Sequence, residues 1–280
     1  YLKEDSLRKG DILNLSITDY AFEGKGISKI DKDGQEKKFV VFVNGGYPGD
    51  EVEAKITKIK KTYAEATVEK VVNQSTDRTE HKCKYFGVCG GCKQQNMKYE
   101  RQLFYKEAQV KDIFERLGGF TNFEIEAIEG SDKIYYYRNK MEYSFAVKRW
   151  LTLAEINSDE KIENQDFALG MHIPNIYDKV LDLEECYLQS ELSNKILNFT
   201  RDFFKEKKTS IYSTFTHEGY LRNLVIRTLF HTNDVMINLV TSYEDDELIN
   251  EYSEKIRKEI PEITTIINNI NLKKAQVAIG

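Results

Sequence analysis

The chain has few of the residues that stiffen or cross-link small secreted domains, with four cysteines, three prolines and one tryptophan among 280 residues. It contains no stretch approaching the roughly 20 apolar residues that cross a bilayer, and no cleavable apolar segment precedes its first polar residues. So few cysteines in so long a chain make a disulfide framework a disfavoured interpretation. These absences predict a cytoplasmic globular protein without a membrane anchor.

What the chain does contain is 40% hydrophobic and 12% aromatic residues, enough for more than one core, so we expect two or three domains. A formal net charge of −5 argues by itself against nucleic acid. The sign is uneven, however: residues 78–111 carry eight Lys or Arg against three acids, and residues 244–262 carry eight acids against three basic residues. A local basic zone attracts phosphates even on an acidic protein, although a solvated face has the same charge pattern.

The cysteines are grouped in a way that suggests a metal site. Cys83, Cys89 and Cys92 lie within ten residues around a Gly-Gly pair, and Cys186 lies far downstream. Three soft ligands in one loop plus one remote ligand suit a 4Fe–4S cluster, and the glycines let backbone N–H groups approach its sulfides. Zinc more often takes two Cys-x-x-Cys pairs. Zinc, a disulfide framework and ordinary buried thiols stay open as alternatives.

Residues 1–72 are expected to form an OB-like barrel of five β-strands. Short runs of alternating or continuous apolar residues are separated by turn signals, at positions 13–17, 39–43, 52–56 and 64–68. Barrels of this kind commonly bind oligonucleotides on one face, although a barrel alone does not specify RNA.

The rest of the chain divides into two further predicted parts. Residues 73–121 hold the cysteine loop and a helix over 98–117, ended by Gly118-Gly119. Residues 122–280 read as a central α+β domain with a mostly antiparallel sheet, so the chain is multi-domain and β-rich. Its expected strands cover 139–147, 167–173, 221–230, 235–241 and 263–270, and its two helices cover 192–203, capped by Ser190, and 244–258.

Several separated stretches carry a resemblance in a fixed order. They are Glu-Gly-Lys-Gly at 23–26, the cysteine loop with the Gln-Gln pair at 94–95, Tyr-Arg-Asn-Lys at 137–140, Leu-Gly-Met-His-x-Pro at 169–174 with Cys-Tyr-Leu-Gln at 186–189, and Gly-Tyr-Leu-Arg-Asn-Leu-Val-Ile-Arg at 219–227. Together they resemble the bacterial RNA uracil-5-methyltransferases of the 23S ribosomal RNA type. That family joins a TRAM domain, a 4Fe–4S cluster, a central RNA-binding domain and a C-terminal methyltransferase domain. The resemblance implies 23S rRNA as the partner of a monomer.

The resemblance implies an enzyme, but its chemistry is not identifiable in these residues. Making 5-methyluracil in that family requires a cysteine thiolate that adds to C6 of uracil, a carboxylate that removes the C5 proton, and a Gly-containing turn that holds S-adenosylmethionine. All four cysteines are assigned to the cluster, and the Gly pairs lie in a turn, a metal loop and a helix cap. We therefore expect the chain to lack the catalytic domain and to be inactive alone, with no catalytic residue and with S-adenosylmethionine bound only by the full-length enzyme.

Candidate RNA contacts come from basic, amide and aromatic side chains on the matching motifs. Their alternative roles are a solvated sheet face, an ion pair with the acidic helix, and shielding of the cluster from water. Three other functions also stay open: a tRNA uridine methyltransferase, a non-catalytic RNA-binding module with a metal staple, and a redox sensor. The candidates are Arg138, Asn139, Lys140, Arg222, Asn223, Arg227, Lys25 and Phe86.

Overall fold

The computed structural model describes residues 7–31, 38–159, 162, 165–174 and 176–274. The chain divides into two compact units: unit 1 comprises Tyr1–Lys84 and Lys93–Asp132, and unit 2 comprises Tyr85–Cys92 and Lys133–Gly280. This grouping differs from the three predicted parts. The tip of the cysteine loop belongs to unit 2, whereas the helix that follows it belongs to unit 1.

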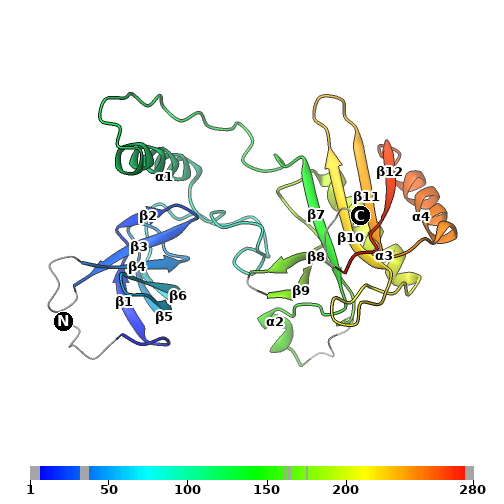
Figure 1. Cartoon of the computed structure of the whole chain (residues 1–280), viewed down its shortest axis with the longest axis horizontal. Helices are drawn as coiled ribbons and strands as arrows, with labels where there is room; N and C mark the ends of the chain where they lie inside the picture. The colour runs from blue at the N-terminus through cyan, green and yellow to red at the C-terminus, as the bar shows by residue number, and fades with distance from the viewer. Residues whose placement is uncertain (1–6, 32–37, 160–161, 163–164, 175, 275–280) are drawn as a thin grey trace. The chain divides into compact units, whose positions relative to one another are not determined.

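Unit 1 contains a six-stranded sheet in the order β1-β5-β6-β4-β3-β2, in which β4 and β6 are parallel and the other neighbours antiparallel (Figure 1). Alternate residues such as Val41, Val43 and Val52 fill its core. Six strands replace the predicted five because the chain folds back at Glu23 and Gly24 to make an additional short hairpin. The strands are β1 (Ile12–Ser16), β2 (Asp19–Ala21), β3 (Lys25–Ile30), β4 (Phe39–Asn44), β5 (Glu51–Ile59) and β6 (Tyr63–Asn73).

The predicted helix of unit 1 is confirmed as α1 (Tyr99–Asp112), which continues as the π-helical turn η1 (Ile113–Leu117). Its buried residue, Tyr105, joins a small cluster with Tyr20, Tyr47 and Met97. Most of the remaining apolar stripe is exposed. The segment after the helix returns beside it, since the Ile128 N–H donates to the Glu107 carboxylate at 2.9 Å.

Unit 2 is built on a second six-stranded sheet, in the order β12-β11-β10-β7-β8-β9. Only the β11–β12 pair among these neighbours is parallel, which confirms the prediction of a mostly antiparallel sheet. Its strands are β7 (Lys140–Ala146), β8 (Ala168–Ile173), β9 (Ile176–Asp182), β10 (Leu221–Thr228), β11 (Val235–Thr241) and β12 (Thr265–Ile270).

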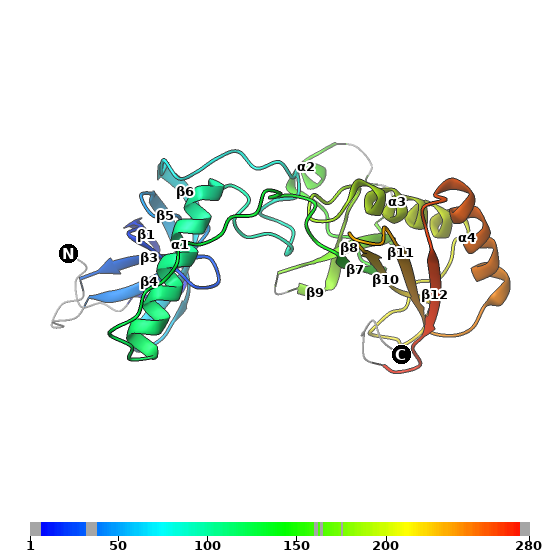
Figure 2. The same cartoon turned by 90° about the horizontal axis from the view of Figure 1, so that it is seen from above.

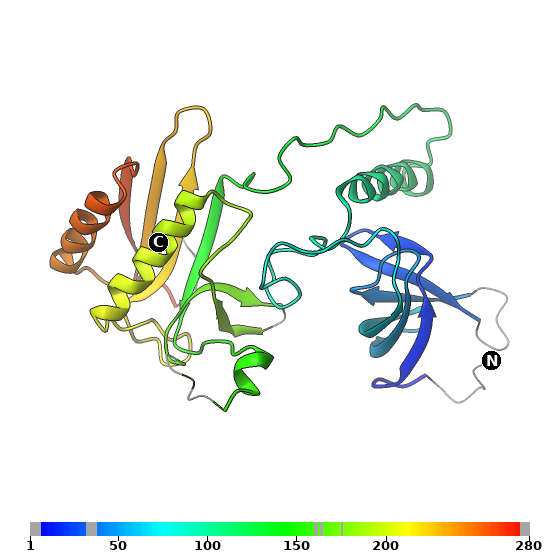
Figure 3. The same cartoon turned by 180° about the vertical axis from the view of Figure 1, so that it is seen from behind.

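Two helices, α3 (Glu191–Glu206) and α4 (Asp246–Glu259), cover one face of this sheet, as Figures 2 and 3 show from two directions. The predicted cap is present, because the Ser193 N–H donates to Ser190 Oγ at 3.3 Å. Asp245 caps α4 in the same way by accepting from the Leu248 N–H at 3.1 Å. The short helix α2 (Leu153–Ile156) and strand β9 were not predicted. Over the described residues, no helix is both long and apolar enough to cross a membrane.

Candidate nucleic-acid interface and cysteine loop

The cysteine loop of unit 2 is held against the core of that unit. Cys89, Cys92 and Cys186 all pack on the same buried cluster, and all are half-buried. The Gly91 N–H points at Cys89 Sγ, 3.4 Å away. A Cβ at Gly90 would lie 3.1 Å from the carbonyl oxygen of β8 residue His172, so the loop passes close to that strand. Gly90 therefore allows a close approach that a larger residue would disturb.

Cys186 is fixed by the first turn of α3. Its N–H donates to Asn194 Oδ1 at 2.9 Å, and its carbonyl oxygen accepts from Asn194 Nδ2 at 3.3 Å. Both backbone groups of the cysteine are thus held by one amide side chain. This arrangement explains how a residue far from the loop in sequence keeps a defined position in unit 2.

Tyr143 of β7 lies in the same core with no solvent exposure. Its hydroxyl has no hydrogen-bond partner among the described residues, which is costly for a buried donor. Burial raises the pKa of this hydroxyl most, and the nearby thiols of Cys186 and Cys89 raise it further. The hydroxyl is therefore a buried donor in the neighbourhood of two sulfurs.

The remaining cysteine, Cys83, belongs to unit 1, where its N–H donates to Gln95 Oε1 at 2.7 Å. Within the described part of the chain, no three or more His, Cys, Asp or Glu side chains are arranged to hold a metal ion. The chemistry of the four thiols suits iron or zinc, and the Gly91 N–H and Tyr143 hydroxyl suit the sulfur atoms of a cluster. The assignment of the four cysteines as ligands stays a prediction.

One end of the second sheet gathers basic and aromatic side chains. Lys140 on β7 lies directly opposite Arg227 on β10, and the Thr228 N–H donates to the Asn139 carbonyl oxygen at 2.9 Å. The hairpin turn beyond β10 presents Phe230, which is 72% exposed, with Lys133 Nζ 5.1 Å from its ring. We call Lys133, Asn139, Lys140, Arg227 and Phe230 the sheet-end cluster.

The structure therefore brings three predicted contacts together and adds two that the sequence reasoning missed. The sequence signal for Phe230 was a phenylalanine beside the polar residues of a predicted hairpin turn. Lys133 precedes β7 and belongs to no motif. Arg138 is exposed just before β7, and its guanidinium contacts Met141 Sδ at 3.5 Å. Phe86 is half-buried, and its RNA contact stays a prediction.

Arg222 and Asn223 do not have the exposed positions expected of RNA contacts. Arg222 is 1% exposed and Asn223 is 2% exposed. The Arg222 guanidinium donates from Nη1 to the carbonyl oxygens of Asn271 and Lys273, each at 2.8 Å, and lies 3.9 Å from the centre of the Tyr212 ring. Asn223 Nδ2 donates to Ser144 Oγ at 3.2 Å. Arg222 therefore holds the chain segment that follows β12.

Lys25 is also engaged within the protein, since its ammonium lies 2.9 Å from the Glu65 carboxylate on β6. Hydrogen bonds from Lys25 and then Lys58 lower the pKa of Glu65 to about 2. In the basic zone, Arg78 is likewise committed: it forms an ion pair at 2.6 Å with Asp50, which is 1% exposed. These pairs reduce the positive charge that unit 1 offers to phosphates.

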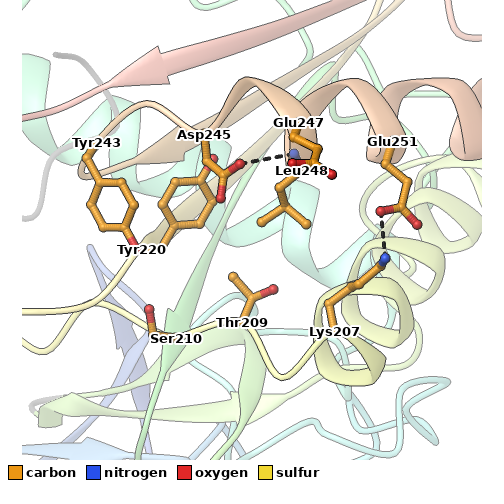
Figure 4. A pocket seen from close by; sticks show the side chains of 9 residues that line it. All are labelled: Lys207, Thr209, Ser210, Tyr220, Tyr243, Asp245, Glu247, Leu248 and Glu251. Atoms are coloured by element: carbon orange, nitrogen blue, oxygen red, sulfur yellow. Dashed lines mark hydrogen bonds and ion pairs between the residues drawn. The ribbon is translucent and has the colours of Figure 1, made fainter.

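A cavity of about 380 Å³ in unit 2, shown in Figure 4, has the opposite character. Asp245, Glu247 and Glu251 line it, and Glu251 is paired with Lys207 at 2.6 Å. Tyr220 forms part of the wall, and burial raises its pKa to about 12. An excess of carboxylates repels phosphates, so this cavity is a poor RNA site.

Comparison with known proteins identifies a domain within unit 1. Residues 7–68 match the family model described as the TRAM domain. Unit 1 contains a TRAM domain. This domain coincides with most of the six-stranded sheet of that unit, so the predicted TRAM assignment is confirmed.

The chain is also similar to RNA methyltransferases. It is 40% identical over 280 residues to an uncharacterized RNA methyltransferase of Chlorobaculum tepidum, covering 99% of this chain and 57% of that protein. It is 41% identical over 256 residues to one from Bacteroides thetaiotaomicron, covering 90% of this chain and 55% of that protein. The chain thus spans about half the length of the curated relatives it matches. Because these relatives are named as enzymes, the comparison does not support the prediction that the chain is inactive alone.

A solved structure has the same fold. The Pyrococcus abyssi tRNA (uracil-54, C5)-methyltransferase, in complex with S-adenosyl-L-homocysteine, aligns with a TM-score of 0.63 and 24% identity, covering 95% of this chain and 53% of that one. At this identity the likeness concerns the fold alone.

Proposed function

We propose that this chain supplies RNA recognition to an S-adenosylmethionine-dependent RNA uracil-5-methyltransferase that modifies uridine in 23S rRNA. The observation that carries the proposal is the 40% identity, across 99% of the chain, to a protein named as an RNA methyltransferase. The TRAM domain and the sheet-end cluster support it. The proposal assigns no catalytic residue to this chain.

The sheet-end cluster has the chemistry that single-stranded RNA requires. Lys140 and Arg227 lie side by side across two strands, so they can each neutralise one of two successive phosphates. Phe230 offers an exposed ring on which an unpaired base can stack. Lys140 is also 3.3 Å from Glu142, but both side chains are exposed, and such a pair is weak enough to give way to a phosphate.

We further propose that Cys83, Cys89, Cys92 and Cys186 ligate a 4Fe–4S cluster. When bound, the cluster would supply a rigid cross-link between the loop and the remote cysteine. The Gly91 N–H, directed at Cys89 Sγ, supports this choice because N–H donors to sulfur stabilise the charge of a thiolate-bound cluster. Iron analysis of anaerobically purified protein tests it: about four irons per chain would support the cluster, and one zinc per chain would replace it with a zinc site.

Methyl transfer is tested with the purified protein. The enzyme is incubated with isotopically labelled S-adenosylmethionine and with unmodified 23S rRNA or unmodified tRNA, and the nucleosides are then separated. Labelled 5-methyluridine in 23S rRNA is the expected result. Label confined to tRNA would instead establish the alternative substrate, and no label in either RNA would contradict the methyltransferase proposal.

A further inference from the structure

We propose that a groove in unit 1, between the β2–β3 hairpin and α1, binds the base of an unpaired RNA nucleotide. The proposal rests on the proposed RNA-binding function and adds a second contact point in the TRAM-containing unit. It arises from an exposed aromatic residue, an apolar wall and two glutamines, whose side-chain hydrogen bonds within the described residues use their amide nitrogens.

The groove has the size and lining of a small-molecule site. Its volume is about 550 Å³, within the range of roughly 300–1,000 Å³ that is usual for ligand pockets. Val110 and Ile113 of the helix and Ile128 of the returning segment form apolar walls. Phe22 stands at the hairpin tip with 72% of its surface exposed. A planar base is the kind of ligand that such walls and such a ring accommodate.

The hairpin holds Phe22 in a fixed place. Glu23 and Gly24 adopt left-handed backbone conformations, with φ of 71° and 87°. A Cβ at Gly24 would lie 3.2 Å from the Tyr20 hydroxyl, so the turn packs closely on the strand before it. Lys93 Nζ also donates to the Glu23 carbonyl oxygen at 3.3 Å. Because the turn is already ordered, stacking on Phe22 requires little further loss of backbone freedom.

Two glutamines give the groove hydrogen-bonding capacity. Gln94 Nε2 donates to the Tyr20 hydroxyl at 3.1 Å, and Gln109 Nε2 donates to the Tyr20 carbonyl oxygen at 3.2 Å. These bonds use the amide nitrogens and leave the amide oxygens as acceptors. Such oxygens suit the amino or imino groups on the edge of a base.

The charges at the rim favour RNA over a protein partner. Lys93 and Lys106 flank the groove, and Glu23 is the one acid among the lining residues. Lys106 is exposed and forms no ion pair with any residue in the described part of the chain. It is therefore available to a phosphate. Exposed Phe114 and Leu117 continue the apolar stripe beyond the groove, so a protein contact is the outcome to be tested against.

The test measures binding of a fluorescein-labelled single-stranded RNA of roughly 12 nucleotides, a length within the usual site sizes, to the whole chain. Phe22→Ala should weaken binding by roughly 5- to 100-fold, which corresponds to the loss of one stacked base. The matched control is Phe215→Ala in unit 2, where the ring is 92% exposed and lies in the other unit from the groove; the affinity of this variant should be unchanged. Lys106→Ala should reduce the salt dependence, lowering the slope by about 0.7.

Three outcomes would count against the groove. If wild-type protein binds the RNA and Phe22→Ala binds equally well, the groove is wrong while the proposed RNA-binding function stands. If wild-type protein fails to bind RNA even at low salt, the proposed function itself is wrong. If Phe22→Ala leaves RNA affinity intact but turns a self-associating protein into a monomer in sedimentation, the groove is a protein interface.

Discussion

Replacing Arg222 with alanine should destabilise unit 2 rather than reduce RNA binding directly. The guanidinium makes two 2.8 Å hydrogen bonds to carbonyl oxygens and lies 3.9 Å from the Tyr212 ring centre, all within a buried site. Hydrogen bonds from a charged group contribute about 1.5–3 kcal/mol each, and a desolvated cation–π contact contributes about 2 kcal/mol. Relief of the guanidinium's own desolvation offsets part of this loss. We expect a net loss of about 3–5 kcal/mol in the free energy of unfolding.

The assay uses the single tryptophan of the chain. Trp150 lies in unit 2, partly buried against its core, so its fluorescence reports the urea unfolding of that unit alone. The matched control is Arg227→Ala on the same strand, where the side chain is exposed and the change should stay within about 0.5 kcal/mol. An Arg222→Ala protein that unfolds within about 1 kcal/mol of wild type would refute the reasoning.

Three further changes probe the remaining sites. Arg227→Ala should weaken binding of single-stranded RNA and reduce the salt slope by about 0.7 without changing stability, as measured by fluorescence anisotropy; unchanged affinity and slope would remove this residue from the interface. Cys186→Ser should lower the iron content and the melting temperature of anaerobically purified protein, and normal values of both would contradict the ligand assignment. Glu65→Gln should lower the melting temperature at neutral pH. Its two lysine partners depress the pKa of Glu65 to about 2, so the stabilisation by this carboxylate is present above about pH 4 and is lost as the pH falls towards 2. The difference in melting temperature between wild type and Glu65→Gln should therefore narrow at low pH. A difference that stays constant with pH would contradict the ion pairs.

Local sequence patterns predicted much of unit 2, because many of its helices and strands are specified by residues close together in the sequence. Met141 and Tyr143 are buried on alternate positions of β7, as their spacing indicated. Ser190 caps α3 through a contact three residues away. The order of acids and bases along α4 likewise matched its dipole. In each case the sequence signal lies within one element.

Contacts between distant residues were harder to foresee. The burial of Arg222 depends on carbonyl groups of Asn271 and Lys273, 49 and 51 residues further along the chain. The register of β10 also shifts between Leu221 and Asn223, an irregularity that an alternating pattern cannot show. The arginine in this apolar strand was therefore predicted to contact RNA, whereas its partners are carbonyl groups of the protein itself.

The sheet-end cluster depends both on local sequence motifs and on contacts between distant residues. Lys140 and Arg227 were predicted from motifs far apart in sequence, and the antiparallel pairing of β7 with β10 places them opposite each other. Phe230 joins them because the turn of the β10–β11 hairpin lies at the same end of the sheet. This position can be assigned only once the strand register is known. The sequence indicated the chemistry, and the topology determined which side chains act together.

The most direct test of RNA recognition is the affinity of the wild-type chain for a uridine-containing single-stranded RNA across a series of salt concentrations. With Lys140 and Arg227 each neutralising one phosphate, the logarithm of the affinity should fall linearly with the logarithm of the salt concentration, with a slope of about −1.4 or steeper. No binding at the lowest salt, or an affinity that does not change with salt, would contradict the account.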